Sequence, residues 1–215
     1  MKTTTNDLIE HFFSRYPVLI SCKTEIINTV ETIIKTYSSN NKVLTCGNGG
    51  SAADAQHIVG ELMKGFVLGR RTPSDKRTKV LAANPDIADK LNENLQDAIP
   101  AISLIGELAL DTAFANDVDP SFGFAQQVYG IANSGDTLIA ISTSGNSKNV
   151  LYAVGVAKAL GVNVVALTGE NGGKLKETAD ISICVPSNIT YQIQEYHLPI
   201  YHVICLAVEN ELFGD

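Results

Sequence analysis

Apolar positions near the start of the chain repeat at helical spacing. One such segment covers about residues 5–16, and a second covers about residues 22–37. The apolar side chains of the second segment fall on one side of a helix: Ile26, Ile27, Val30, Ile33 and Ile34. The pattern predicts two amphipathic helices, which would form an N-terminal helical arm over about residues 1–40.

Short apolar runs rich in β-branched residues follow this arm. They predict buried strands at residues 42–46, 101–104, 136–141, 163–168 and 181–185. Helical segments are expected between and after them, at residues 52–64, 124–132, 148–160 and 192–212. Apolar strands that alternate with helices favour a parallel sheet covered on both faces. The sequence therefore predicts an α/β fold of the flavodoxin-like kind, a three-layer αβα sandwich with a central parallel sheet and added N-terminal helices.

A polar, basic stretch interrupts this alternation between residues 64 and 79, where six lysine and arginine side chains occur. We interpret it as a solvated loop. Residues 87–98 are polar with helical character, which is typical of a lid or of an inserted arm, and the pattern does not decide between the two. We expect one domain over residues 1–215 with an insertion at about residues 67–100.

Hydroxyl groups are concentrated in the turn that follows the predicted strand at residues 136–141. Ser142, Thr143, Ser144 and Ser147 surround Gly145, and a helix is expected to start directly after them. The free amides and the dipole at a helix N-terminus favour an anion, and a glycine lets the backbone approach it closely. One hydroxyl is enough to cap a helix, so four of them indicate a site for a phosphate monoester.

An earlier turn, Gly47-Asn48-Gly49-Gly50-Ser51, has the same position after its own strand. It does not have the spacing of the dinucleotide-binding GxGxxG motif, and it lacks the lysine of a P-loop. We therefore expect no nucleotide cofactor. Because parallel strands present their carboxyl ends at one edge of a sheet, both turns are expected near one ligand.

Candidate acid–base groups come from two predicted helices. His57 and Glu61 are four residues apart, so they share a helix face close to the first turn. Gln194, Glu195, His197 and His202 lie in the last helix, which Pro199 is expected to kink or to delimit. A carboxylate and an imidazole suit proton transfer through an enediol, and the same side chains suit Zn²⁺. Taken singly, these residues are better explained as a surface pair and a core histidine, and it is their position next to the two turns that makes a catalytic or metal-binding role an equal alternative.

Charge and targeting signals restrict the kinds of partner. The net charge of −7 argues against binding of nucleic acid, which needs a basic surface. The sequence has neither an apolar run long enough for a transmembrane helix nor the apolar core of a signal peptide. Its four cysteines are scattered and form no CxxC pair. We expect a cytoplasmic protein without a membrane partner.

Several of these segments together resemble the sugar isomerase (SIS) family, and most closely its phosphoheptose isomerase branch. The resemblance extends over about residues 33–213. It is carried by the runs GNGGSAADAQHIVGEL, ISTSGNSKNV, VVALTGENGGKL and QEYHLPIYH and by the pair Asn116-Asp117. It implies the SIS fold, a sugar-phosphate substrate and a homotetramer. The implied reaction converts sedoheptulose 7-phosphate, a ketose, to D-glycero-D-manno-heptose 7-phosphate, an aldose.

The resemblance also implies roles for single residues. Glu61 would be the catalytic base and His202 the catalytic acid. Zinc, which some family members bind, would have the ligands His57, Glu61, Gln194 and His202. Substrate would be bound by Asn48, Gly49, Gly50, Ser51, Glu61, Asn116, Asp117, Ser142, Thr143, Ser144, Ser147 and Gln194. Gly65 stands where the family commonly has an arginine, which puts the identity of the sugar in question more than the class of reaction.

Two other functions remain open at the level of sequence. The first is a non-catalytic regulatory SIS protein that binds phosphosugars, similar to the protein that associates with the bacterial replication initiator. Such proteins lack the glutamate and the histidine, so the presence of Glu61 and His202 favours an enzyme. The second is another SIS enzyme, acting on arabinose phosphate or an amino sugar, but these usually carry other catalytic residues or additional domains.

Overall fold

A single parallel sheet forms the centre of the molecule. The computed structural model describes residues 1–71 and 74–214. Five strands in the order β2-β1-β3-β4-β5 make up the sheet, and every neighbouring pair is parallel. The strands are β1 (Val43–Cys46), β2 (Ala101–Ser103), β3 (Thr137–Ile141), β4 (Asn163–Thr168) and β5 (Ile181–Cys184). Each lies within one or two residues of a predicted strand.

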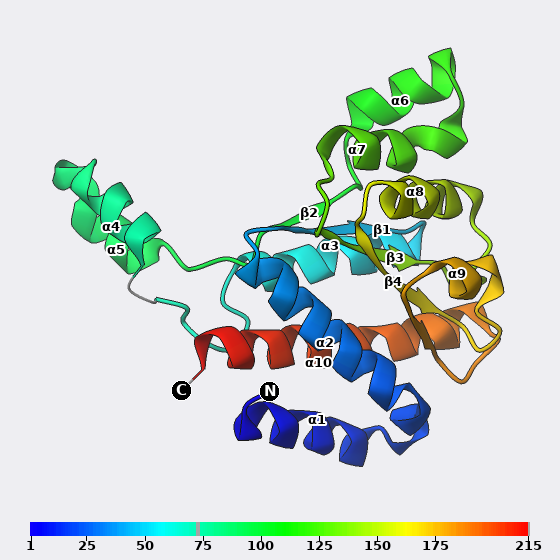
Figure 1. Cartoon of the computed structure of the whole chain (residues 1–215), viewed down its shortest axis with the longest axis horizontal. Helices are drawn as coiled ribbons and strands as arrows, with labels where there is room; N and C mark the ends of the chain where they lie inside the picture. The colour runs from blue at the N-terminus through cyan, green and yellow to red at the C-terminus, as the bar shows by residue number, and fades with distance from the viewer. Residues whose placement is uncertain (72–73, 215) are drawn as a thin grey trace.

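Helices cover both faces of the sheet, which confirms the three-layer αβα prediction (Figure 1). One face packs against α2 (Lys23–Ser38), α3 (Gly50–Met63) and α10 (Thr190–Phe213). The other face packs against α7 (Gly123–Ile131), α8 (Lys148–Ala159) and α9 (Gly173–Thr178). Strand β3 shows why both layers form, because Ile139 is buried in the first and Leu138 in the second.

The N-terminal helices pack within the chain. Helix α1 (Thr3–Arg15) lies against α10, and the 3₁₀ segment η1 (Pro17–Cys22) connects it to α2. The apolar side chains Ile9 and Phe12 of α1 are buried there, as are Ile26 and Ile33 of α2. The apolar faces of these two helices are therefore accounted for without a partner subunit.

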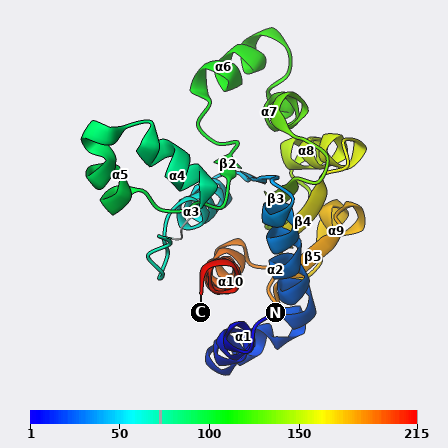
Figure 2. The same cartoon turned by 60° about the vertical axis from the view of Figure 1, so that its left-hand side comes forward.

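The segment predicted as an insertion contains two short helices that extend away from the sheet (Figures 1 and 2). They are α4 (Asp75–Ala82) and α5 (Ala88–Asn94), joined by η2 (Pro85–Ile87). The solvated-loop interpretation of residues 64–79 was wrong in two respects. Residues 75–79 are helical, because Ser74 caps α4 by accepting a hydrogen bond from the amide of Arg77, and Arg70 is buried. Thr72 and Pro73 lie outside the described residues.

Two features of the remaining helices differ from the sequence expectations. Helix α6 (Leu108–Asp117), followed by η3 (Pro120–Phe122), was not predicted, and none of its described side chains is buried. Helix α10 runs continuously through Pro199, so the proline does not mark its start. In the described part of the chain, every helix is too short or too polar to cross a bilayer.

Candidate active site

The hydroxyl-rich turn lies between β3 and α8, at the carboxyl end of the central strand. The hydroxyl oxygens of Ser142 and Ser147 are 2.9 Å apart and share a hydrogen bond. Ser147 occupies the N-cap position of α8 without a side-chain hydrogen bond to the helix amides. Ser142 is buried, Thr143 is half-buried and Ser144 is exposed. The hydroxyls thus gather at the positive end of a helix dipole, where an anion is favoured.

Gly145 is required by the shape of this turn. Its φ angle of +64° lies in the left-handed region, and a Cβ atom there would be 1.9 Å from the carbonyl oxygen of Gly172. The backbone amide of Leu175 also donates to the carbonyl of Gly145 at 3.0 Å. The segment after β4 therefore presses directly on the turn and holds its conformation.

The first glycine-rich turn is joined to the start of α8 through two asparagines. The side-chain amides of Asn48 and Asn149 exchange hydrogen bonds of 2.9 and 2.8 Å. Gly50, at the start of α3, faces Gln194 of α10 so closely that a Cβ atom would be 2.6 Å from Nε2 of the glutamine. Ser51 is buried and Gly49 has a φ angle of +58°. The structure thus brings both turns and Gln194 into one region.

His57, Glu61 and His202 form a second group, further along α3 and α10. Nε2 of His57 lies 3.1 Å from Oε1 of Glu61, one helical turn away. The His57 and His202 rings pack edge to face with centroids 5.1 Å apart. Nδ1 of His57 lies 2.9 Å from the hydroxyl of Tyr201, which also donates to Asp54 at 3.3 Å.

Two atoms of this group are buried without a hydrogen-bond partner among the described residues, Oε2 of Glu61 and Nε2 of His202. The exposed ammonium of Lys64 is 3.9 Å from Oε2, too far for a hydrogen bond. Burial and the neighbouring His57 lower the pKa of His202, against the opposing effect of Glu61. An orphaned carboxylate oxygen beside an orphaned imidazole nitrogen is an arrangement that a bound reactant can satisfy.

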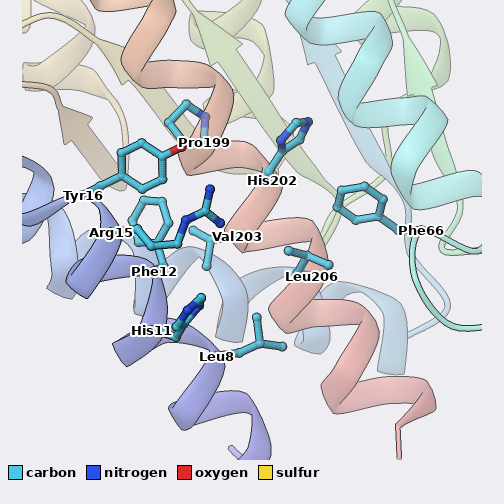
Figure 3. A pocket seen from close by; sticks show the side chains of 10 residues that line it. All are labelled: Leu8, His11, Phe12, Arg15, Tyr16, Phe66, Pro199, His202, Val203 and Leu206. Atoms are coloured by element: carbon cyan, nitrogen blue, oxygen red, sulfur yellow. The ribbon is translucent and has the colours of Figure 1, made fainter.

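A cavity of about 140 Å³ between α1 and α10 reaches His202 (Figure 3). Arg15 and Tyr16 lie on one side of it, and His202 and Phe66 on the other. The hydroxyl-rich turn borders a different hollow of about 270 Å³, lined by Thr143 and Ser144. Within one chain, the turn and His202 therefore face separate cavities.

Of the four side chains considered as zinc ligands, His57, Glu61 and His202 lie together, but Gln194 does not join them. In the described residues, no group of three or more histidine, cysteine, aspartate or glutamate side chains is placed to hold a metal ion. Gln194 packs on Gly50, and its position in α10 is about 12 Å along the helix axis from His202. The four side chains do not fit a common metal ion in this arrangement.

Asn116 and Asp117 lie apart from both groups at the end of α6. Both are exposed, and the side-chain amide of Asn116 donates to the carboxylate of Asp117 at 2.7 Å. Among the described residues, neither side chain is hydrogen-bonded to a candidate residue of the site other than its neighbour.

A buried ion pair next to the end of α3, between Arg70 and Glu209, was not predicted from the sequence. Nε of Arg70 donates to Glu209 at 2.6 Å, and both side chains are almost completely buried. Arg70 also donates to the backbone carbonyls of Glu61 and Leu62, at the end of α3. Burial alone would raise the pKa of Glu209, but amide bonds from residues 66–68 and the bond from Arg70 lower it overall. A basic loop residue and a glutamate 139 positions away give no signal of this pairing in the sequence.

Tyr201 and Asp54 were not predicted as site residues either, although their spacing in the sequence indicates a place near His57 and His202. Asp54 precedes His57 by three residues and so shares its helix face, and Tyr201 is adjacent to His202. Their contact with His57 depends on the packing of α3 against α10, which spacing alone does not give.

The fold and these turns place the chain among proteins with a SIS domain, and the model of that family matches residues 86–169. The phosphoheptose isomerase of Akkermansia muciniphila is 35% identical over 199 residues, 93% of this chain and 92% of the relative. That of Aliarcobacter butzleri is 41% identical over 179 residues, 83% and 81% of the two chains. The chain belongs to the phosphoheptose isomerase family.

Solved structures agree with this assignment. A phosphoheptose isomerase from Francisella tularensis superposes with a TM-score of 0.73 at 30% sequence identity. The superposition covers 97% of this chain and the whole of the other.

Proposed function

We propose that the chain interconverts a ketose phosphate and an aldose phosphate by proton transfer through an enediol. The proposed substrate is sedoheptulose 7-phosphate and the product D-glycero-D-manno-heptose 7-phosphate, in keeping with the names of the relatives. One observation carries the proposal: beside His57, Oε2 of Glu61 and Nε2 of His202 are both buried and have no hydrogen-bond partner in the described part of the chain. A carboxylate and an imidazole left free in this way are suited to exchange protons with a sugar.

The phosphate is proposed to bind at the turn between β3 and α8. The hydroxyls of Ser142, Thr143, Ser144 and Ser147 would donate to its oxygens, together with backbone amides at the start of α8. Neutral donors suit this chain, whose net charge is −7, because they bind an anion without a basic surface. The sugar hydroxyls would be bound by Asn48, Gly49, Gly50, Ser51, Asn116, Asp117 and Gln194.

Glu61 is proposed to take the proton from C1 of the ketose while His202 gives a proton to the carbonyl oxygen at C2. This yields the enediol, and return of a proton to C2 with loss of the proton from the C1 hydroxyl yields the aldose. The lowered pKa of His202 keeps its ring neutral at neutral pH, so that one nitrogen can donate while the other accepts. Burial of Glu61 keeps water from competing for its free oxygen.

A zinc ion at His57, Glu61, Gln194 and His202 is the part of the family pattern that this arrangement supports least. Gln194 does not reach the other three donors, so the proposed steps pass through protein groups only. Dialysis of the purified protein against a chelator is expected to leave turnover unchanged. A loss of activity that added Zn²⁺ restores would make the metal part of the reaction.

A homotetramer in the cytoplasm completes the proposal. Because the hydroxyl-rich turn and His202 border separate cavities in one chain, a neighbouring subunit is proposed to bring a turn and an acid–base pair to one substrate. Exposed apolar side chains on η1 and at the edge strand β2, such as Val18, Ile20 and Ile102, support subunit contacts. Sedimentation equilibrium is expected to give four times the chain mass of 23.0 kDa.

The reaction is tested with purified protein and sedoheptulose 7-phosphate, with the aldose product measured by chromatography. We expect turnover by the wild type and its loss in Glu61→Gln and His202→Ala. Glu177→Gln, an exposed glutamate on α9, is a matched control that should keep full activity. Binding of the phosphosugar without turnover by the wild type would contradict the enzyme and favour the non-catalytic regulatory alternative.

A further inference from the structure

We propose that Tyr201 and Asp54 are positioning residues that orient the base Glu61 through His57. The four side chains form one chain of contacts, Asp54–Tyr201–His57–Glu61, which joins α3 to α10. The inference rests on the proposed role of Glu61 and adds to it a means of holding the carboxylate in its working orientation.

The anchor of this chain is the buried hydroxyl of Tyr201. Tyr201 is 2% exposed, and its hydroxyl donates to Oδ1 of Asp54 at 3.3 Å. The hydroxyl can share its one proton with Nδ1 of His57, 2.9 Å away, so that the neutral ring keeps its own proton on Nε2 and can donate it to Glu61.

His57 needs such an anchor because packing does not fix its ring. About 42% of its side chain is exposed. Its remaining ring contacts are edge-to-face, with Tyr201 at 5.3 Å and His202 at 5.1 Å between centroids. The bond at Nδ1 therefore sets the direction in which Nε2 points, as a second hydrogen bond on an imidazole generally does.

Nε2 of His57 then holds one oxygen of the base. It lies 3.1 Å from Oε1 of Glu61, whereas Oε2 has no hydrogen-bond partner among the described residues. A carboxylate held at one oxygen presents the other in a fixed direction. Misplacement of a catalytic group by about 1 Å lowers rates by up to about 100-fold. Loss of the hydrogen bond between His57 and Glu61 should therefore have a measurable effect on kcat.

Stability alone does not account for Asp54. Burial raises its pKa, against the opposing effects of the Tyr201 hydrogen bond and His57. Its Oδ2 atom is buried without a partner in the described structure. A partly buried carboxylate with one unsatisfied oxygen is unfavourable for folding. A buried polar group of this kind calls for an explanation other than stability, and a role in the site provides one.

The kinetic test uses Tyr201→Phe, which removes only the hydroxyl. We expect kcat to fall by about 10- to 100-fold with KM changed less than about twofold, because binding is left intact and the base is misplaced. Tyr196→Phe, a half-buried tyrosine on the same helix, is the matched control and should behave as the wild type. In a His57→Leu background, Tyr201→Phe should have no further effect. A wild-type kcat in Tyr201→Phe, or two additive losses, would overturn the inference.

A second readout separates this inference from the proposed reaction. In protein labelled with ¹⁵N only at histidine, Tyr201→Phe and Asp54→Asn should shift the ring resonances of His57, and Tyr196→Phe should not. This holds whether or not sedoheptulose 7-phosphate is a substrate. Wild-type inactivity would refute the proposed reaction, whereas unchanged His57 resonances in Tyr201→Phe would refute the positioning role.

Discussion

Asn48 and Asn149 exchange two side-chain hydrogen bonds, of 2.9 and 2.8 Å, although 101 residues separate them. One residue belongs to the first glycine-rich turn, and the other lies in the first turn of α8. The pair ties together the two segments that we propose to bind the sugar and its phosphate.

Asn149→Ala is therefore expected to weaken substrate binding more than catalysis. Loss of two exposed amide bonds is worth about 1 kcal/mol, which corresponds to a rise in KM of roughly fivefold with kcat nearly unchanged. Steady-state kinetics measure both constants. Asn94→Ala, on α5, removes an exposed asparagine away from the site and serves as the control. An unchanged KM in Asn149→Ala would show that the turns keep their places without this pair.

Gly145→Ala is expected to abolish binding of the phosphate group. The added Cβ atom would be 1.9 Å from the carbonyl oxygen of Gly172, so the turn has to open. On the neighbouring helix α8, Gly155 has no atom within 4 Å of such a Cβ, and Gly155→Ala is the matched control. Calorimetric titration with the sugar phosphate checks both variants. Wild-type affinity in Gly145→Ala would place the phosphate elsewhere.

The buried pair of Arg70 and Glu209 should contribute strongly to stability. Their side chains are 0% and 1% exposed, so removal of Arg70 takes the ion-pair partner from the buried charge of Glu209 and leaves it the backbone amides of residues 66–68. We expect Arg70→Met to lower the free energy of unfolding by about 3–5 kcal/mol. Lys158→Met, which breaks the exposed pair with Asp180, should cost less than about 1 kcal/mol. Urea denaturation gives the free energy of unfolding of both variants. Equal losses in Arg70→Met and Lys158→Met would contradict the claim that burial makes the first ion pair the more important one.

Because of His197, the free energy of unfolding is expected to be lower in mild acid than at neutral pH. Burial lowers its pKa from 6.5 to about 4, so between these values the unfolded chain binds a proton that the folded chain does not. Stability from the neutral ring is thus complete above pH 6.5 and is lost as the pH falls toward 4. Across this interval, protonation of His197 is expected to lower the free energy of unfolding by about 3 kcal/mol.

The measurement for His197 is the free energy of unfolding between pH 7 and pH 4. His197→Leu and His197→Gln should both show a flatter decline than the wild type over this interval. If both variants decline as steeply as the wild type, the loss of stability comes from other groups.

The sheet could be predicted from the sequence because each strand is a short apolar run between turns, and both faces of the sheet are buried. Helix α6 could not be predicted, since none of its described side chains is buried and its sequence shows no helical stripe. Arg70 was assigned to a solvated loop because its charged neighbours dominate the local pattern. Its burial depends on Glu209, which only the folded chain brings near.

In the candidate site, too, some features could be predicted from the sequence and others appear only in the folded chain. The two turns could be located because their glycines and hydroxyls lie at the ends of strands. The groups on α3 and α10 could be named from helical spacing, but not the order of contacts among them. Tyr201 bonds His57 because two helices pack at a particular rotation, and no spacing within one helix encodes that rotation.

The central claim is that the hydroxyl-rich turn and the pair of Glu61 and His202 act on one substrate. A crystal structure of Glu61→Gln with sedoheptulose 7-phosphate tests it most directly. We expect the phosphorus atom at the turn of residues 142–147, and C1 and C2 between residue 61 and His202 of the same chain or of a neighbouring one. A phosphate bound at that turn with C1 and C2 directed away from every copy of residue 61 would contradict the account.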